Sequence, residues 1–469
     1  MVDRPVEYPA VDREVAYIRT EDAPRLPAPS SEIGPRAWLW RNIFASMADY
    51  SSLPKAVTSV LMTIITVFTA YAIIWLTWTL LDFAVFSATF GDPEGIKREA
   101  CLPNPTGACW PYIQAKWYQF MYGFYPPEDV WRVNTCFAIL AAGIGWLIFG
   151  PSHKGKVAAF MLIGFPVLAY VLLNGMPVED DGDLSHIFAG VWFPAIVAAV
   201  LFAGWWLAQS GTFGDVGQAF APALLMGVIV VGIFAVLPLV TMVVDLALGT
   251  EVVETNKWGG LTITLVVAIA GIVVSLPMGM LLALGRRSNA PIIRYSSVIF
   301  IEVVRGIPLI SVLFFASAML PYFLAPGVDF NKLLRAMIGV MLFASAYMAE
   351  VIRGGLQAIP KGQYEGGMSL GLSFWQQMRL IIMPQALTTV IPGIVNTFIG
   401  LFKDTTLVLI ISIFDLLGIL MTTLKDPEWA TPTTAYTGYL TIALIYWVFC
   451  FGMSRYSVHM EKKLDRSHR

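Results

Sequence analysis

The chain has 469 residues, of which 57% are hydrophobic and only 13% are charged, and its formal net charge at pH 7 is -2. Soluble domains carry about 25% charged residues, so this chain has too little charge to cover globular domains in water. Several apolar runs are long enough to cross a bilayer as helices. The composition therefore predicts an all-α, polytopic membrane protein, and the near-zero net charge does not point to nucleic acid.

The chain begins with a polar, proline-rich stretch without a signal-peptide core, and we expect residues 1–54 to form a cytoplasmic tail. Ten apolar segments follow, and each is expected to be a transmembrane helix. They occupy residues 56–82, 133–150, 156–174, 187–208, 222–248, 258–284, 297–324, 335–352, 387–411 and 433–454. A shorter apolar stretch near 412–424 contains Asp415, so we expect it to be half-buried or re-entrant.

Loop charges give the expected orientation. Lys154, Arg286 and Arg353 lie in loops that ten spans would place inside, as does the basic tail 461–469, and the short outer loops are poorer in Lys and Arg. Lys and Arg accumulate in cytoplasmic loops. The pattern predicts that both termini are cytoplasmic and that the long loop 83–131 lies outside.

The four cysteines fall into two groups. Cys101 and Cys109 flank Leu-Pro-Asn-Pro-Thr-Gly-Ala in the outer loop, where an oxidising compartment would allow a disulfide between them. Cys136 and Cys450 lie in apolar segments and are expected to be ordinary buried thiols. No histidine or second cysteine pair completes a metal-ligand set, so we expect no metal site.

Ionisable residues at or near membrane depth are concentrated in the second half of the chain. Such charges are costly and usually face the interior of a helix bundle or a water-filled path, so we expect function to lie here. The residues are Glu302, Arg305, Glu350, Arg353, Lys403 and Asp404.

The polar segment 360–385 has the pattern of two short helices joined by a glycine. Gly371 is expected to end the first helix, because glycine tolerates the left-handed conformation beyond a helix C-terminus. Ser373 and Gln376 have the spacing of a capping box for the second helix, and Pro384 is expected to end it. Such an element on the cytoplasmic face is suited to a groove in a partner protein.

At these residues the chain resembles the permeases of binding-protein-dependent ABC importers. Their cytoplasmic EAA loop reads Glu-Ala-Ala, three residues, Gly, nine residues, Ile, one residue, Leu-Pro. Glu365, Gly371, Ile381 and Pro384 fall at the required spacings, although two glycines replace the alanines and a methionine replaces the leucine. The resemblance implies that this loop docks on an ATPase subunit and transmits its movements to the membrane helices.

Further segments are similar to the polar amino-acid branch of these permeases. They begin at Glu302 (Glu-Val-Val-Arg-Gly-Ile-Pro), Ala346 (Ala-Tyr-Met-Ala-Glu-Val-Ile-Arg) and Asn396 (Asn-Thr-Phe-Ile-Gly-Leu-Phe-Lys-Asp). The resemblance implies a type I ABC importer permease core of five helices in residues 255–460. The preceding extension, residues 55–250 with about five helices, is similar to that of the larger permease of general L-amino-acid transporters.

The resemblance also implies the function and partners of the chain. It would form the translocation path for polar or general L-amino acids across the bacterial inner membrane. Its partners would be membrane lipid, a dimer of ATPase subunits, a second permease, expected to be a paralogue, and a periplasmic amino-acid-binding protein. The chain has no Gly-x-x-x-x-Gly-Lys-[Ser/Thr] loop, so we expect it to be no enzyme and to hold no cofactor, with ATP and Mg bound by a partner subunit.

Candidate substrate contacts lie on the fourth core segment. Asn396 and Lys403 are seven residues apart, as are Thr397 and Asp404, so the two pairs share roughly one helix face. Fixed charges and hydroxyls can replace part of the hydration of a zwitterionic substrate. The alternative, that Lys403 and Asp404 pair with charges on nearby helices and hold the bundle together, stays open.

Arg305 and Glu350 are two further candidates for the substrate path, with a structural role favoured for each. Arg305 precedes a Gly-Ile-Pro sequence that suggests a break between a cytoplasmic elbow and the following span, with Pro308 in the first turn. Glu350 and Arg353 are three residues apart on one helix and are able to pair.

Two other functions are consistent with parts of the sequence. An ion-gradient-driven secondary transporter would use Glu350, Lys403 and Asp404 as coupling sites, but it would have no need of the docking element. An ABC permease for another small polar solute, such as an opine, would share the fold and differ in its pocket.

Overall fold

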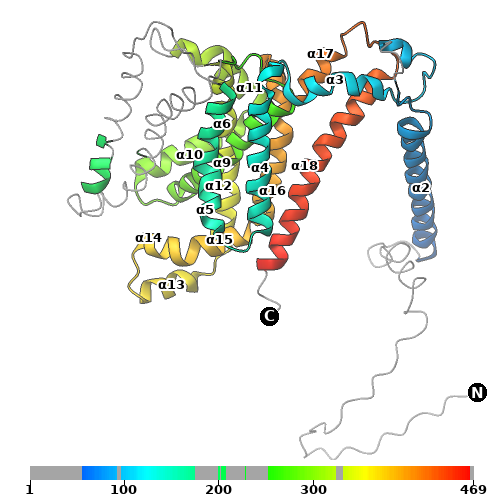
Figure 1. The fold of residues 1–469 in the computed structure, drawn as a ribbon. Coiled ribbons are helices and arrows are strands. Elements are labelled where there is room, and N and C mark those ends of the chain that lie inside the picture. Colours follow the sequence, from blue (N-terminus) through cyan, green and yellow to red (C-terminus); the bar gives the residue numbers. More distant parts are fainter. Residues whose placement is uncertain are drawn as a thin grey trace, which may run out of the picture. The chain divides into compact units, whose positions relative to one another are not determined.

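The computed structural model describes residues 55–91, 97–174, 199–200, 202–207, 228, 252–323 and 331–464, and these are mostly helical (Figure 1). The chain divides into two compact units, Met1–Phe86 and Ser87–Arg469. In the first unit, α2 (Lys55–Leu81) continues into a π-helical turn, Asp82–Phe86. Large apolar side chains are exposed all round this helix, as expected of a helix in contact with lipid.

The second unit is a helical bundle with additional helices at both ends (Figure 1). One end carries α13 and α14, and the other carries α3 and α17; we call these the α13 end and the α17 end. The long helices that connect the two ends are α4 (Val130–Phe149), α9 (Gly260–Arg286), α12 (Lys332–Ala358), α16 (Ile391–Asp404) and α18 (Thr434–Leu464).

Among the described residues, six helices are long and apolar enough to cross a membrane, or up to eight if each of two bent helix pairs counts as one span. One bent pair is formed by α5 (Lys154–Ala159), the π-helical turn Phe160–Gly164 and α6 (Phe165–Asn174). The predicted spans 187–208 and 222–248 and the tail 1–54 lie wholly or largely outside the described residues.

The second bent pair corrects the prediction of one continuous span over residues 297–324. α10 (Pro291–Gly306) and the helix that starts with α11 (Leu309–Phe314) meet at 105°. Pro308 causes the break, because a proline disfavours helical dihedrals in the residue before it, and Ile307 is extended with φ -109° and ψ 136°. The break that the Gly-Ile-Pro sequence suggested is therefore present, and α10 is a separate elbow.

Close helix packing in the bundle depends on small residues of α9. A Cβ atom added to Gly279 would lie 2.7 Å from Met348 Cγ of α12, and one added to Gly271 would lie 2.7 Å from Leu401 Cδ2 of α16. Small residues at such positions let helices approach closely, which favours association where apolar lipid supplies no hydrophobic driving force. α9 therefore lies at the centre of the core.

Residues 87–91 and 97–126 form a cap on the α17 end. The cap contains α3 (Trp110–Tyr122) and the disulfide between Cys101 and Cys109, whose Cα atoms are 5.6 Å apart. Tyr112 Oη and Thr423 Oγ1 are 2.7 Å apart, and Lys116 Nζ lies 2.7 Å from Asp426 Oδ2. The outer segment is thus packed on the core as part of one compact unit.

Two glycines let the cap contact the start of α9. Gly123 has φ +70°, and a Cβ atom at this position would lie 2.3 Å from the Cα atom of Gly259. The backbone N–H of Gly260 donates to Phe414 O at 2.9 Å, and the Thr262 hydroxyl donates to Met121 O at 2.9 Å. Only glycine fits at so close a backbone approach.

The apolar stretch near 412–424, expected to be half-buried or re-entrant, forms the short helix α17 (Leu416–Thr423). Asp415 caps this helix: its carboxylate accepts hydrogen bonds from the N–H groups of Leu417 and Gly418 at 3.2 and 2.9 Å. The side chain is fully buried. Burial raises the pKa of Asp415 to about 6, and the hydrogen bonds only partly oppose this effect.

The first prediction concerns the disulfide. In the native protein, Cys101 and Cys109 should react with a maleimide only after reduction. Removing the bridge with a Cys101→Ser/Cys109→Ser double variant should lower the stability of the folded state by about 2–3 kcal/mol, because a closed loop restricts the unfolded chain. Mass spectrometry of labelled peptides and thermal unfolding in detergent measure the two effects. Reactive thiols before reduction would contradict the prediction.

A second prediction follows from the raised pKa of Asp415. The stability contributed by its neutral form is present below about pH 4 and is lost as the pH rises through about 6. Asp415→Asn keeps a capping oxygen without a charge, so it should be more stable than the native protein at pH 8, by up to about 3 kcal/mol. Thermal unfolding of both proteins from pH 4 to 8 tests this. A stability difference that is constant with pH would refute it.

Candidate functional site

The segment 360–385 folds into two short helices joined at Gly371. α13 (Lys361–Ser369) ends in a Schellman motif: the N–H of Gly371 donates to Met368 O at 2.9 Å, and the N–H of Leu372 donates to Gly367 O at 3.2 Å. Gly371 has φ +71°, the left-handed conformation that this motif requires. The predicted glycine junction is therefore present.

The second helix begins at the expected capping box. The Ser373 hydroxyl accepts from the N–H of Gln376, and the Gln376 side chain accepts from the N–H of Ser373 at 2.9 Å. α14 (Phe374–Gln377) then passes through a π-helical turn, Met378–Ile382, into α15 (Met383–Thr389). We call α13 through this π-helical turn the coupling element.

The prediction that Pro384 ends the second helix is wrong. Pro384 lies in the first turn of α15, and the helix continues beyond it to Thr389. The preceding π-helical turn explains this, because its wider backbone accommodates both a proline ring and a missing N–H donor.

Gln377 joins the two helices of the coupling element into one body. It is buried, and its Nε2 donates to the backbone oxygen of Tyr364 in α13. A Cβ atom on Gly367 would lie 2.5 Å from this Nε2. Glycine in place of the second alanine of the EAA pattern therefore makes room for the Gln377 amide.

The outer surface of the coupling element is apolar and unpacked. Met368, Leu370, Phe374 and Leu380 have exposed fractions of 61, 74, 54 and 64%. Glu365, the predicted acidic residue of the loop, is also exposed. Apolar side chains grouped beside polar ones in this way indicate a protein–protein contact surface.

The inner surface of the element is anchored in the bundle. Met378 and Ile382 are buried in one apolar cluster with Ile352 and Leu356 of α12 and Ala283 of α9, and Ile381 packs at its edge. We call this the anchor cluster. Its residues pack the coupling element directly against α9 and α12.

A polar contact supplements the anchor cluster. Arg287, just after α9, donates to the Tyr364 hydroxyl at 3.0 Å and lies with its guanidinium carbon 5.5 Å from the Tyr364 ring centroid. The Tyr364 hydroxyl donates to Leu356 O at 3.3 Å. The sequence reasoning missed Arg287, Tyr364 and Gln377, because no spacing rule links Arg287 to a segment 77 residues later.

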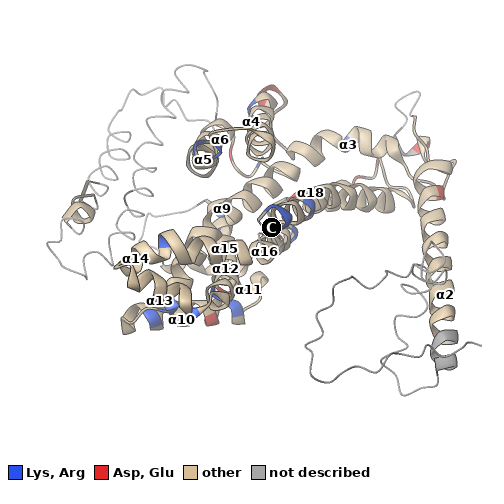
Figure 2. Ribbon diagram, turned by 90° about the horizontal axis from the view of Figure 1, so that it is seen from below, with Lys and Arg blue, Asp and Glu red and all other residues tan. Residues whose placement is uncertain are grey.

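Ion pairs surround Glu350 at the α13 end, where Figure 2 shows Lys and Arg on α10 and at the start of α13. Glu350 Oε2 lies 2.7 Å from Arg353 Nη2, and its Oε1 lies 2.9 Å from Arg286 Nη1 and 3.6 Å from Arg305 Nη1. Arg286 also pairs with Glu302 at 2.8 Å. Glu350 and Arg305, both candidates for the substrate path, thus belong to an ion-pair network that joins α9, α10 and α12.

The polar residues of α16 lie in different surroundings. Asn396 and Lys403 are exposed, Asp404 is half-buried, and the Thr397 hydroxyl donates to Gly393 O at 2.9 Å within its own helix. Among the described residues, neither Lys403 nor Asp404 has a partner in an ion pair.

The opposite face of α16 is buried. Phe402 packs between the rings of Tyr446 and Phe449 of α18, at centroid distances of 5.2 and 5.3 Å. Ile394 and Leu401 are also buried. The exposed face with Asn396 and Lys403 is thus left uncovered by the described part of this chain.

A bundle of membrane-length helices with an exposed apolar surface at one end is the architecture of a membrane transport subunit. The family model for the binding-protein-dependent transport system inner membrane component matches residues 275–466. Two curated permeases match nearly the whole chain at 40% identity. The chain therefore belongs to the binding-protein-dependent ABC transporter permease family. It is a multi-pass inner-membrane protein.

Two curated relatives cover nearly the whole chain. One is the inner membrane amino-acid ABC transporter permease protein YhdY of Escherichia coli, 40% identical over 94% of this chain and 96% of the relative. The other is the glutamate/glutamine/aspartate/asparagine transport system permease protein BztC of Rhodobacter capsulatus, 40% identical over 97% of this chain and 100% of the relative. Both relatives therefore include the N-terminal extension.

A solved structure described as an amino acid ABC transporter with histidines matches 44% of this chain and 92% of its own chain, with 29% identity and a TM-score of 0.39. In this family a permease works with an ATPase and a binding protein.

Within the described residues, no group of His, Cys, Asp and Glu is arranged to hold a metal ion.

The third prediction tests the glycine junction. Gly371→Val should uncouple ATP hydrolysis from transport, because a side chain at φ +71° costs about 1–2 kcal/mol and would distort the junction. Gly371→Asn is the matched control, since asparagine tolerates this conformation and nothing lies within 4 Å of the new Cβ atom. Glu365→Ala should weaken docking without changing the fold. Uptake and ATPase rates at equal membrane expression measure these effects. Native rates of uptake in Gly371→Val and Glu365→Ala would contradict the prediction.

Proposed function

We propose that the chain is the permease subunit of an ATP-driven importer of polar L-amino acids. The coupling element carries this proposal: it exposes an apolar docking surface and is anchored by its other side to α9 and α12. The printed names of the two relatives favour amino acids, including glutamate, glutamine, aspartate and asparagine, as the substrate class.

The proposed orientation places the α13 end in the cytoplasm and the α17 end outside. Arg286, Arg305 and Arg353 gather at the α13 end, which agrees with the enrichment of Lys and Arg on the cytoplasmic side. The Cys101–Cys109 disulfide then lies in the oxidising compartment. Both chain termini are cytoplasmic in this arrangement.

The proposed complex contains two ATPase subunits, a second permease and a periplasmic amino-acid-binding protein. An ATPase subunit binds the coupling element and hydrolyses ATP with Mg. The uncovered polar face of α16 supports the second permease, because polar groups facing lipid would be costly. A paralogue or a second copy of the chain would complete the path along this face.

The geometry suggests how movement is transmitted. Gln377 holds α13 and α14 together, so a groove that closes on the element moves it as one body. The anchor cluster passes this movement to α9 and α12, and Arg287 opposes separation of α13 from α9. The ion pairs of Glu350 connect the same helices and would rearrange when the α13 end opens.

The function is tested by expressing the chain with the neighbouring transport genes and purifying it in mild detergent. An ATPase and a second permease should co-purify, and the reconstituted complex should take up radioactive glutamine only with ATP and the binding protein. Uptake by the isolated chain driven by an ion gradient would refute the proposal.

The fourth prediction concerns the substrate path on α16. Asn396→Ala and Thr397→Ala should change the relative uptake of acidic, neutral and basic amino acids. Lys403→Ala and Asp404→Ala should reduce total uptake more severely, by about tenfold or more, because each removes a charge available to one end of a zwitterion. Competition uptake at matched expression measures this. Unchanged selectivity in all four variants would mean that this face has a structural role only.

A further inference from the structure

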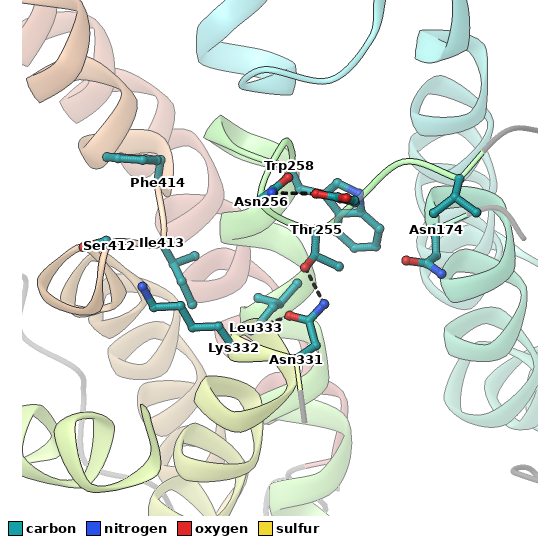
Figure 3. Close-up of a pocket in the computed structure, with 12 residues that line it drawn as sticks. Asn174, Thr255, Asn256, Trp258, Asn331, Lys332, Leu333, Ser412, Ile413 and Phe414 are labelled. Atoms are coloured by element: carbon teal, nitrogen blue, oxygen red, sulfur yellow. Dashed lines mark hydrogen bonds between the residues drawn. The ribbon is translucent and has the colours of Figure 1, made fainter. Parts of the chain in front are cut away.

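A cavity of about 540 Å³ lies beside the loop before α17 and is lined by none of the polar residues of α16 discussed above (Figure 3). Three segments enclose most of it: the loop before α9, the first turn of α12 and the loop before α17. The lining residues are Asn174, Val252, Glu254, Thr255, Asn256, Trp258, Asn331, Lys332, Leu333, Ser412, Ile413 and Phe414.

Two opposite charges line this cavity without pairing with each other. Glu254 accepts a hydrogen bond from Asn256 Nδ2 at 2.7 Å through Oε2. Among the described residues, Lys332 makes no ion pair and its ammonium group donates no hydrogen bond. A carboxylate and an ammonium group that remain separate within one cavity can each make a charge-assisted hydrogen bond to a bound molecule.

The backbone and side chains around these charges hold the cavity in shape. Asn331 caps α12 by accepting from the N–H of Leu333 at 2.9 Å, and its Nδ2 donates to Thr255 Oγ1 at 2.6 Å. The Trp258 indole donates to Val253 O at 3.1 Å, which fixes the ring in the wall. These contacts join the loop before α9 to α12.

The loop before α17, the third segment of the cavity wall, is also held in place by backbone contacts. Ser412 has φ +56°, and Phe414 O accepts from the N–H of Gly260 at 2.9 Å, so the loop before α17 is tied to the start of α9. Leu333 and Ile413 are buried and form part of the apolar wall. The cavity therefore combines a preformed apolar wall with separate polar groups, the usual composition of a small-molecule site.

We propose that this cavity is a second binding site for an α-amino acid, with Glu254 facing the substrate ammonium and Lys332 its carboxylate. Charge-assisted hydrogen bonds of this kind are the stronger ones in proteins. The proposal rests on the proposed import of amino acids. The site lies at the outer mouth of the permease core, where a substrate released by a binding protein would arrive before it enters the helix bundle.

The experiment uses the complete transporter in lipid nanodiscs, without binding protein or ATP. Val252→Cys, in the cavity wall, serves as a reporter whose labelling by a membrane-impermeant maleimide is followed with time, and the native chain gives the background. L-Glutamine should slow the labelling in a saturable way. N-acetyl-L-glutamine lacks the ammonium and L-glutaminamide lacks the carboxylate, so each should protect about tenfold more weakly.

Charge-neutral variants locate the site. Glu254→Gln and Lys332→Gln in the reporter background should each weaken protection by about tenfold. Glu128→Gln and Lys425→Gln are matched controls, because both residues are exposed charges at the same end and outside the cavity. The controls should be protected like the parent.

Every result of this experiment either supports or overturns the proposed amino-acid site. Protection by L-glutamine that is lost in the two cavity variants supports the site. No protection at any glutamine concentration, protection by either analogue as strong as by L-glutamine, or parental protection in either cavity variant would each overturn it. ATP-driven uptake of glutamine by the same preparation, with binding protein added, tests the proposed function separately, so the two ideas fail independently.

Discussion

The burial of Ile382 and Met378 against α9 and α12 fixes the position of the coupling element, and the proposed coupling to an ATPase depends on this packing. These side chains belong to a segment whose other surface is exposed, and the segment would have no fixed position without them. Apolar contacts are individually weak and have little directional preference, yet close packing makes the cluster resistant to deformation. In the proposed mechanism, a force applied to the exposed surface would therefore be passed to two membrane helices instead of being absorbed by the loop.

Glycines make close contacts possible at both ends of the bundle. Gly123 and Gly259 allow two backbones to touch at the α17 end, and Gly367 admits the Gln377 amide at the α13 end. In each case a methyl group would push apart elements that have to meet. The glycine content of this chain thus reflects contacts between elements as well as turns, and such positions are invisible to propensity rules based on single segments.

The sequence predicted the helical class, the glycine junction, the capping box and the break before Pro308, because each depends on residues close together in the chain. It did not predict the cap formed by residues 87–91 and 97–126, since Tyr112 meets Thr423 across a separation of 311 residues. Pro384 was misread because a local rule ignored the π-helical turn before it. Neither Arg287 nor the cavity beside Lys332 has a local signature, since long-range packing creates both.

The attachment of α9 differs between its two ends, and this difference limits how the helix is able to move. At its start, backbone groups are engaged: Gly260 N–H bonds to Phe414 O, and the Thr264 hydroxyl accepts from Leu416 N–H. At its other end, Arg287 is held by side-chain contacts that re-form easily. Sliding α9 along its axis would break the hydrogen bonds from Gly260 to Phe414 and from Leu416 to Thr264, whereas a tilt about its beginning would disturb them less. If the proposed coupling moves α9, the helix would tilt about its start beneath the disulfide-bonded cap, and its displacement would grow toward the α13 end.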